Sequence, residues 1–323
     1  MKIQRLSISV LLLCYLTLTA CKISHPILAR EPIDQSNTDD LAVQSTLLAH
    51  TTRGCWQSMT HSVPNNGRQP STFILAAGAN VGQLIFSDQD ARQFAQAMQN
   101  RFKVPTQQVC LLESVYRVEF EQALRDLKRR VKPNDRVIIF FSGAGAYVRD
   151  DNGDEADQVD EVLITLDVQD SKHPDRQDVV TDDNLVRLIN QLPTERVMTF
   201  IDAGYEGSRH PENQERSNQA RHKFYAKGEI GTFSLPLAGR QSDRMESAGG
   251  LEHIKGQVFA AALESQKAYE MKQGGLFTHS FLKVLTHYPD ASLTQVFEYT
   301  QAEMRKKFGL IKGMKLWQVF RFV

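Results

Sequence analysis

The chain contains few cysteines and no excess of charge of either sign. Lysine and arginine together number 38, aspartate and glutamate also 38, and the formal net charge is zero at pH 7. This balance argues against nucleic acid as a partner and against membrane contact through a polybasic surface. Of the four cysteines, only Cys55 and Cys110 lie beyond the N-terminal segment. They could form one disulfide, but a buried free thiol is equally common in an apolar run such as that around Cys110, so the pairing stays open.

The N-terminal segment lacks the length of a membrane span. Its apolar stretch covers residues 8–18 and follows the basic residues Lys2 and Arg5. A helix needs roughly 18 to 20 apolar residues to cross a bilayer. A shorter stretch, with basic residues before it and small residues after it, is typical of a signal peptide, which we expect over residues 1–20.

The end of this segment indicates lipidation. Residues 18–21, Leu-Thr-Ala-Cys, resemble a bacterial lipobox, in which the peptide is cut before the cysteine and that cysteine is acylated. The alternative is an ordinary signal peptide with a cysteine nearby by chance. Several acyl chains on Cys21 would anchor the protein to a membrane. Lys22 is not the aspartate that retains such proteins in the inner membrane, so we expect an outer-membrane lipoprotein that faces the periplasm.

The remaining chain, 41% hydrophobic and 24% charged over its whole length, is long enough for one large α/β domain or two small ones. Residues 21–70 are polar and rich in turn formers, which predicts a flexible tether. From residue 71 to 323, strand patterns alternate with helical ones and predict a three-layer α/β/α sandwich around a mostly parallel sheet. Residues 208–255 are polar and glycine-rich, and predict an insertion between core strands. The expected strands are 72–77, 108–112, 136–142, 162–166, 196–202 and 257–262, and the expected helices are 88–102, 118–131, 182–192, 278–285 and 293–308.

Several segments, taken in chain order, resemble segments of the caspase and metacaspase superfamily (peptidase C14). They are a first strand with its glycine turn, the start of the first helix, the strand before an S-G-H-G motif, an acidic loop, the segment before a late helix, and the G-x-F-T start of that helix. In this sequence they are residues 73–80, 87–91, 134–143, 150–161, 268–270 and 275–278. The resemblance implies a caspase-haemoglobinase-type α/β fold over most of the chain after the tether.

Two departures from that family pattern concern its chemistry. Where the family has S-G-H-G with a histidine base, residues 142–145 are Ser-Gly-Ala-Gly, with Ala144 in place of the histidine. Where it has D-x-C-x-S-G with a cysteine nucleophile, residues 202–207 carry Gly204 in that place. A methyl group and a hydrogen atom can neither accept a proton nor attack a carbonyl carbon. The resemblance therefore implies a protease-shaped protein that does not cleave.

The same resemblance implies a binding role for neighbouring residues. In metacaspases the aspartate two positions before the cysteine lines an acidic pocket for arginine or lysine, and Asp202 occupies that position. The alternative is that Asp202 caps its strand or bonds to the next loop. Tyr205 and Glu206 would lie where a substrate lies in active relatives. A peptide or protein partner with a basic side chain is thus expected.

The acidic loop resembles a calcium-binding pattern. Asp150, Asn152 and Asp154 stand at alternate positions, with Glu161 further along, but Glu155 stands where an EF-hand needs a glycine. Metacaspases often bind calcium near such loops, so the loop is a candidate Ca²⁺ site. The alternative is a solvated acidic loop. No cofactor is required by either interpretation.

Three functions are therefore weighed. The first is a lipid-anchored, catalytically inactive caspase-like protein that binds a peptide or protein partner at the cell envelope. The second is an active cysteine endopeptidase of the caspase and metacaspase family with a displaced nucleophile. The third is a structural envelope lipoprotein without a ligand. The insertion at 208–255 is either a partner surface or a loop.

Overall fold

The computed structural model describes residues 55–56, 69–150, 153, 159–170, 175–205, 220–223, 225, 250–262 and 267–308. These ranges all belong to one compact unit that begins at Leu47. The expected signal peptide, the expected lipidation site Cys21 and most of the expected tether lie outside the described residues. Among the described residues, no helix has the length and apolar character that crossing a bilayer requires.

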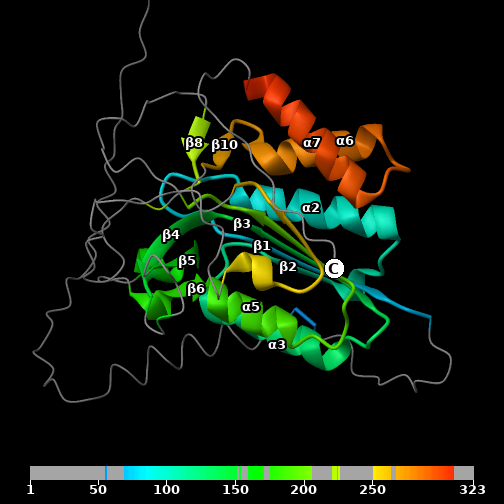
Figure 1. Cartoon of the computed structure of the whole chain (residues 1–323), viewed down its shortest axis with the longest axis horizontal. Coiled ribbons are helices and arrows are strands. Elements are labelled where there is room, and N and C mark those ends of the chain that lie inside the picture. The colour runs from blue at the N-terminus through cyan, green and yellow to red at the C-terminus, as the bar shows by residue number, and fades with distance from the viewer. Residues whose placement is uncertain are drawn as a thin grey trace, which may run out of the picture. The chain divides into compact units, whose positions relative to one another are not determined.

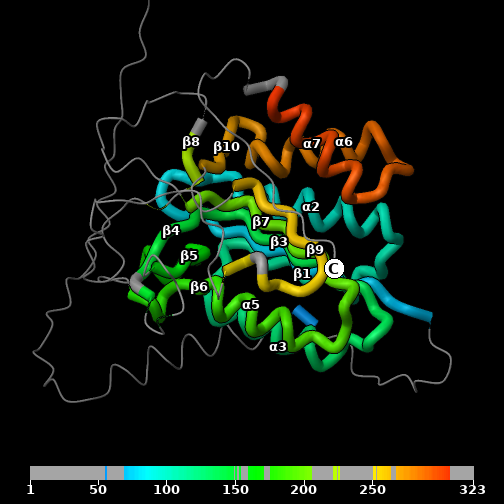
Figure 2. Tube along the Cα trace, in the orientation of Figure 1, coloured from blue at the N-terminus to red at the C-terminus, as the bar shows by residue number. Residues whose placement is uncertain are grey.

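A five-stranded sheet forms the centre of the unit, in the order β2-β1-β3-β7-β9, with every neighbouring pair parallel. Its strands are β1 (Thr72–Gly78), β2 (Val109–Leu112), β3 (Arg136–Ser142), β7 (Val197–Asp202) and β9 (Gln257–Ala260). Strands β1 and β3 are buried along almost their whole length, as expected for parallel strands that helices cover on both faces. The trace in Figure 2 shows these strands side by side.

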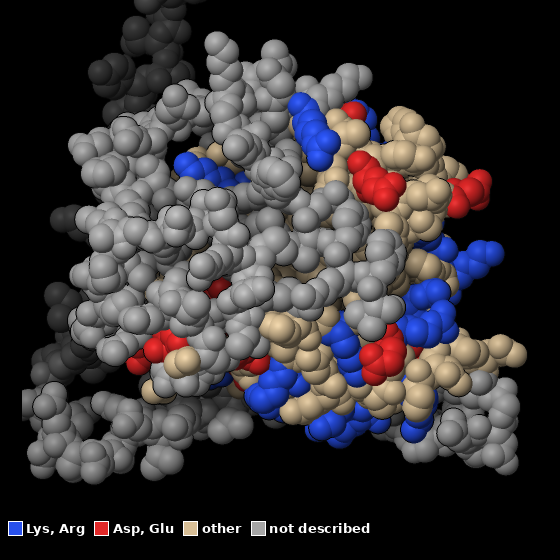
Figure 3. All heavy atoms as spheres, in the orientation of Figure 1, with Lys and Arg blue, Asp and Glu red and all other residues tan. Residues whose placement is uncertain are grey.

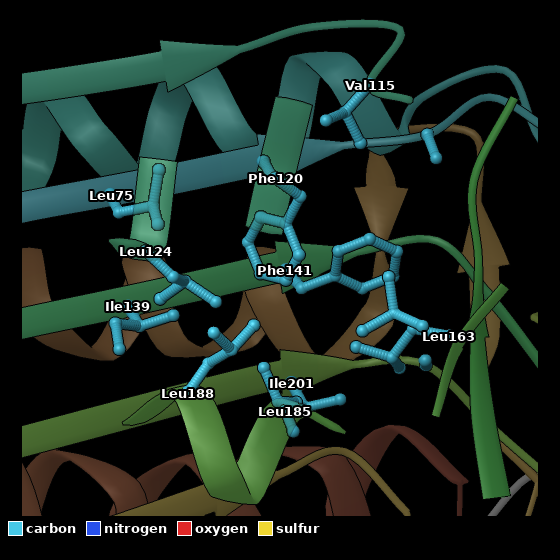
Figure 4. Close-up of a cluster of buried hydrophobic side chains, with 14 of the residues drawn as sticks. Leu75, Val115, Phe120, Leu124, Ile139, Phe141, Leu163, Leu185, Leu188 and Ile201 are labelled. Carbon is cyan, nitrogen blue, oxygen red and sulfur yellow. The ribbon is translucent and has the colours of Figure 1, made fainter. Parts of the chain in front are cut away.

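Helices cover both faces of this sheet (Figure 1). One face carries α2 (Ser87–Phe102), α6 (Leu276–His287) and α7 (Leu293–Phe308), and the other carries α3 (Arg117–Arg130) and α5 (Asp182–Asn190). Alternate residues of β1 point to opposite faces, so Ile74 packs with the first layer and Leu75 with the second. Figure 4 shows the second layer, where Phe120 of α3 and Leu188 of α5 meet sheet residues such as Ile139. The predicted three-layer α/β/α fold is confirmed.

One predicted strand lies elsewhere. The pattern at 162–166 was expected to belong to the parallel series, whereas β5 (Val159–Ile164) pairs antiparallel with β4 (Ala144–Arg149) and β6 (Val179–Thr181) in a separate sheet. The physical reason is the length of the connection. Only residues 150–158 join β4 to β5, and so short a link joins antiparallel strands, whereas parallel strands need a longer crossover.

A third small sheet, in the order β11-β10-β8, lies beside the helices of the first layer. It contains β8 (Ala220–His222), β10 (Tyr269–Met271) and β11 (Gly274–Gly275), all antiparallel. The remaining short elements are helix α4 (Asp167–Asp170) and the 3-10 turns Thr106–Gln108, Arg176–Asp178 and Leu251–His253. On the surface, charged side chains of both signs are interspersed on the face shown in Figure 3.

The open question of the cysteines has a clear outcome. Cys55 and Cys110 form a disulfide with their Cα atoms 5.1 Å apart, which ties residue 55 to strand β2. The next residue, Trp56, is buried, and its indole N–H donates to the carbonyl oxygen of Ala123 at 3.3 Å. Both residues fall within the range 21–70 that the sequence assigns to the tether, yet they pack against the domain.

Candidate functional site

The two positions where the family resemblance expects catalytic groups lie at the carboxyl ends of neighbouring strands. Ala144 follows β3 after a single glycine, and Gly204 comes two residues after the end of β7. The register pairs Ser142 with Asp202 at these strand ends. The carboxyl ends of adjacent parallel strands are where α/β sheets place ligand sites. Sequence and topology thus bring both positions to one edge of the sheet.

Positions 144 and 204 carry neither an imidazole nor a thiol, and the backbone at residue 204 is closely packed. A Cβ atom added to Gly204 would lie 2.5 Å from the backbone nitrogen of Ala268, a distance that real Cβ atoms do not show. A Cβ atom added to Gly145 would lie 2.6 Å from the carbonyl oxygen of Gly204. The backbone at residue 204 is therefore packed too closely to accept any side chain without movement of the Ala268 backbone.

A segment of the expected insertion crosses this edge of the sheet. The carbonyl oxygen of Lys223 accepts two hydrogen bonds, from the N–H of Gly145 at 3.1 Å and from the N–H of Gly204 at 3.0 Å. The Lys223 N–H donates to the carbonyl oxygen of Ala268 at 3.0 Å, and the Tyr225 N–H donates to that of Gly145 at 2.9 Å. Two converging backbone donors are the arrangement that stabilises an oxygen carrying negative charge. Here they hold an ordinary peptide carbonyl of the chain itself.

The side chain of Lys223 is completely buried among acidic and hydroxyl groups. Its Nζ lies 2.6 Å from Oγ of Ser142 and 3.1 Å from the carbonyl oxygen of Asp202. It also forms ion pairs of 3.3 Å with Oδ2 of Asp90 and 3.3 Å with Oδ1 of Asp202. We call the residues Asp90, Ser142, Asp202 and Thr278 the lysine site.

The two carboxylates of the lysine site are held by donors from the start of α6. Oδ1 and Oδ2 of Asp90 accept from the Gly275 N–H at 3.0 and 2.9 Å, and Oδ2 also accepts from the Ser142 hydroxyl at 2.8 Å. Oδ2 of Asp202 accepts from the Thr278 N–H at 3.1 Å and from its hydroxyl at 2.6 Å. The first turn of a helix favours negative charge, because its N–H groups lack partners within the helix.

Burial and neighbouring charges have opposite effects on the pKa values of Asp90 and Lys223. Burial raises the pKa of the Asp90 carboxyl to about 6, against the opposing effect of the Lys223 ammonium. Burial also lowers the pKa of Lys223, but the carboxylates of Asp202 and Asp90 outweigh it, so that pKa lies above its ordinary value. The lysine is therefore charged, and the site contains one ammonium between two acidic groups.

A second acidic group lies next to this segment. Glu270 on β10 is fully buried, and its carboxylate accepts from the backbone N–H groups of Ile85 at 3.0 Å and Phe86 at 2.8 Å. The same carboxylate binds Nε of Arg221 at 2.8 Å. Arg221 of β8 and Lys223, the residue directly after β8, thus each contact a buried acid.

The residues predicted to bind a peptide have different surroundings. Asp202 is buried in the lysine site and paired with the chain's own Lys223. Tyr205 is buried, with its ring centroid 6.5 Å from that of Tyr147. Glu206 lies outside the described residues. The structure therefore brings Asp202 and Tyr205 to the edge that carries Gly204, and binding by a partner stays a prediction.

The expected calcium loop is only partly described. Asp150 accepts from the Gly153 N–H at 2.7 Å, and Glu161 lies in β5 opposite Tyr147. Asn152 and Asp154 lie outside the described residues. Within the described ranges, no three acidic, histidine or cysteine side chains come together as a metal site would require. The calcium site stays a prediction.

One acidic residue at the end of this loop is paired with an arginine of the chain itself. Asp160 is almost fully buried and forms an ion pair with Arg176. Burial raises the pKa of its carboxyl to about 6, while the hydrogen bond and charge of Arg176 act against that rise. An internal arginine therefore supplies part of the positive charge that the acidic loop needs.

Sequence reasoning missed most of the lysine site. Two of the missed residues lie inside segments that it singled out: Asp90 is in 87–91 and Thr278 is in 275–278. A search for acidic and hydroxyl residues in those segments would have found them. Lys223 lies in the polar insertion, and no local pattern indicates that its side chain is buried.

A comparison with known protein families identifies the family to which this domain belongs. A sequence model described as the caspase domain matches residues 75–318, most of the chain. The chain belongs to the caspase-domain family. In this caspase-domain protein, Asp202 and the N–H groups of Gly145 and Gly204 surround a lysyl residue at the edge that carries Ala144 and Gly204.

Its similarity to individual proteins is more distant. Metacaspase-1 from Cryptococcus neoformans var. neoformans is 24% identical over 217 residues, which cover 58% of this chain and 46% of that protein. Metacaspase-1 from Yarrowia lipolytica is 24% identical over 219 residues, with coverage of 58% and 46%. The match thus spans about half the length of these curated relatives. The crystal structure of protein GSU0716 from Geobacter sulfurreducens has a TM-score of 0.50 and 18% identity, covers 71% of this chain and 88% of that one, and shares the fold.

Proposed function

We propose that this caspase-domain protein is a lipid-anchored protein of the cell envelope that binds a peptide or protein partner and does not cleave it. The observation that supports this proposal most directly is the surroundings of Lys223. The N–H groups of Gly145 and Gly204 and the acids Asp90 and Asp202 hold a lysyl residue of an extended segment, whereas no thiol or imidazole is present at positions 144 and 204. The site has the features of recognition without those of cleavage.

The chemistry of peptide cleavage explains why these losses are decisive. Thiol proteases need a thiolate to attack the carbonyl carbon and a base that takes and returns a proton. Two backbone donors alone stabilise negative charge on an oxygen but form no bond to carbon. Ala144 and Gly204 supply neither group. A peptide bond whose carbonyl group is polarised at this edge therefore stays intact.

The disulfide argues against a displaced cysteine nucleophile. Cys55 and Cys110 are bonded to each other, and a disulfide sulfur is not a thiolate. The other cysteines, Cys14 and Cys21, belong to the N-terminal segment for which a signal peptide and a lipid anchor are expected. The domain thus offers no free thiol among its described residues.

Hydrolysis of a peptide library by the full chain tests this proposal. The library carries basic and acidic residues before the scissile bond and is incubated with and without Ca²⁺, with an active metacaspase as the positive control. We expect no cleavage by the native protein under either condition. Turnover by the native protein that survives removal of contaminating proteases would contradict the proposal.

A reverted variant, Ala144→His/Gly204→Cys, supplies the matched comparison. Because a Cβ atom at residue 204 would lie 2.5 Å from the Ala268 nitrogen, restoring the two groups does not restore the space they need. We therefore expect the variant to be as inactive as the native chain and to have a lower melting temperature. Activity in the variant alone would show that the Ala268 backbone moves aside readily. It would also show that the native site lacks only the imidazole and the thiol.

A further inference from the structure

The amino ends of the central strands form the edge of the sheet opposite to the lysine site. Helices α2 and α3 both end at this edge, because each runs back from the carboxyl end of the strand before it. Five basic side chains belong to the segments that meet there, and we call them the basic edge: Arg101, Lys103, Lys132, Arg136 and Arg196. In Figure 3, lysine and arginine side chains gather on the side of the molecule where α2 ends in Figure 1.

Two arginines of this edge lie side by side at the starts of neighbouring strands. Arg136 is the first residue of β3, Arg196 directly precedes β7, and the N–H of Val137 donates to the carbonyl oxygen of Arg196 at 2.9 Å. The guanidinium carbon of Arg136 lies 4.7 Å from the centroid of the Phe102 ring at the end of α2. Burial lowers the pKa of Arg136, and the positive charge of Arg196 lowers it further. Two like charges are thus held close together at a partly buried position, where they repel each other.

The acidic groups of the described residues do not neutralise this edge. Their ion pairs include none of the five basic side chains. Glu195 pairs instead with Lys255 at 3.5 Å. The carboxylate of Asp135 is buried, and it accepts from the backbone N–H groups of Ser71 at 2.7 Å and Lys132 at 2.9 Å. An anion from outside therefore meets positive charge that the described part of the domain leaves largely uncompensated.

Helix ends explain only part of this charge. Cations near the C-terminus of a helix are stabilised by its last carbonyl groups, which accounts for Arg101 in the last turn of α2. Arg136 and Arg196 stand at strand starts, and Lys132 lies in the loop between α3 and β3. The stabilisation of helix termini therefore does not require the positive charge at these three positions.

An exposed aromatic ring lies beside the basic edge. The guanidinium of Arg101 donates to the carbonyl oxygens of Pro289 and Ala291, which ties the end of α2 to the loop after α6. Tyr288 in that loop is 51% exposed, and its ring centroid lies 4.8 Å from that of Tyr299, which is 42% exposed. Tyrosine rings are enriched at membrane–water interfaces, and basic side chains are attracted to anionic lipid. The edge thus combines two side-chain types that favour a lipid surface.

The first described residues of the chain also contact this end of the domain. The N–H of Arg136 donates to the carbonyl oxygen of Ser71, just before β1, at 2.8 Å. Arg130, in the last turn of α3, donates to the carbonyl oxygen of Trp56. These are the described residues nearest in sequence to the proposed lipidation site Cys21, which favours a lipid surface over other polyanions as the partner of this edge.

We propose that the basic edge, with Tyr288 beside it, binds the headgroups of anionic phospholipids. This inference goes beyond the proposed function, because it neither needs nor excludes peptide binding, and it adds a second membrane contact to the proposed lipid anchor. The zero net charge of the chain argues against a polybasic surface only where charges are evenly spread, and the fold gathers positive ones at this edge. The carboxyl edge of the sheet, with Asp202, then faces away from the lipid.

Binding to vesicles tests the inference. The full chain carrying Cys21→Ser, to which no acyl chain is attached at that position, is titrated with vesicles of phosphatidylcholine alone. It is also titrated with vesicles of equal parts phosphatidylcholine and phosphatidylglycerol, the anionic probe. In the same background, two variants each remove two charges from the basic edge: Arg136→Gln/Arg196→Gln and Lys103→Gln/Lys132→Gln.

The matched control is Arg92→Gln/Lys272→Gln. It removes two charges from exposed positions near the start of α2 and between β10 and β11. Because it changes the net charge by the same amount, it separates the effect of the basic edge from that of overall charge. All the proteins share one N-terminal segment, so the affinity of that segment for lipid is the same in every comparison.

The expected result is a preference for anionic vesicles that weakens as salt is added. Each edge variant should bind them roughly 25-fold more weakly, since a basic residue near such a surface contributes about fivefold, and the control should change little. Lys103 and Lys132 are exposed, so their variant keeps the test valid if the arginine variant does not fold. An equal loss in the control, no preference for anionic vesicles, or tighter binding to polyglutamate at the same salt concentration would overturn the inference.

An environment-sensitive dye gives a second test on the chain with its native Cys21. The dye is attached to a cysteine introduced at one of two exposed positions, Pro133→Cys between α3 and β3 or Gln273→Cys between β10 and β11. On vesicles with phosphatidylglycerol, we expect the emission to shift to the blue at position 133 and not at position 273. A shift at position 273 as large as that at position 133 would overturn the inference.

The outcomes separate this inference from the proposed function. Peptide cleavage by the native chain would contradict the proposed function and would leave the vesicle preference unaffected. Loss of that preference would contradict the lipid inference and would leave the absence of cleavage unaffected.

Discussion

Lys223 places a buried ammonium between the buried carboxyl groups of Asp90 and Asp202. Such an arrangement is stable only as a set, because an isolated charge in the interior has neither water nor a partner. Ser142 and the carbonyl oxygen of Asp202 complete the contacts of the ammonium. The charge of the buried Lys223 ammonium is thus stabilised by residues from three other parts of the chain.

Removal of the ammonium should be costly. We expect Lys223→Met to lower the free energy of unfolding by about 3 to 5 kcal/mol, since it leaves two buried carboxyl groups without their cation. Urea denaturation followed by circular dichroism measures the change. The control is Lys283→Met, which breaks the exposed pair with Glu303 and should cost no more than about 1 kcal/mol. Equal effects of the two substitutions would contradict the buried pairing.

The pKa of Asp90 predicts a pH dependence with a definite sign. Burial raises this pKa to about 6, above the 3.8 of an ordinary aspartate, so the folded protein binds the proton more tightly than the unfolded one. The stability that Asp90 contributes is therefore fully present below about pH 4 and is lost as the pH rises through about 6.

Comparison with Asp90→Asn isolates that contribution. Between about pH 4 and about pH 7, the native chain should lose unfolding free energy relative to this variant. The same comparison with Asp290→Asn, at an exposed position, serves as the control. A native chain that gains stability relative to Asp90→Asn over this range would show that the sign is wrong.

At the scale of elements, the site depends on where strands and helices end. β3 and β7 end side by side at Ser142 and Asp202, and α6 begins at Leu276 with its first N–H groups beside the two carboxylates. The segment before β1 is also held, because the disulfide joins Cys55 to β2. The domain as folded therefore includes residues upstream of the first strand of the sheet.

Loss of this disulfide should destabilise the domain. The bond closes a loop with a sequence separation of 55 residues, for which the chain-entropy relation gives about 4 kcal/mol. We expect Cys55→Ser/Cys110→Ser to lower the free energy of unfolding by up to that amount in urea denaturation. Addition of a reductant should lower the stability of the native chain toward that of the variant and leave the variant unchanged. A native chain indifferent to the reductant would contradict the bond.

At the scale of the whole molecule, the proposal joins a caspase-domain unit to a lipid anchor. The proposed anchor depends on residues 18–21, whereas the proposed recognition depends on the lysine site in the domain. The two parts can be tested separately because they share no residues. A lipid anchor would hold the recognition site at the membrane surface of the envelope.

Two cysteine variants distinguish the lipid anchor from an ordinary signal peptide. We expect Cys21→Ser to abolish incorporation of labelled fatty acid and to move the protein from the membrane fraction to the soluble one, since the proposed lipobox is acylated at the Cys21 thiol. Cys14→Ser, within the apolar stretch, is the matched control and should change neither readout. Labelled protein in the Cys21→Ser variant would contradict the lipobox interpretation.

The sequence by itself determined the strands of the central sheet and the five long helices that cover it, because buried parallel strands are continuous apolar runs and amphipathic helices repeat at their own period. Its motifs indicated the family. It also located Ala144, Gly204 and Asp202. The partner of Asp202 was decided only by the tertiary structure, as were the disulfide and the antiparallel pairing of β5. An ion pair between residues 202 and 223, or between 90 and 223, forms when chain segments from different elements converge. No local pattern records that convergence, and a lysine in a polar insertion has the same sequence signature whether it is solvated or buried.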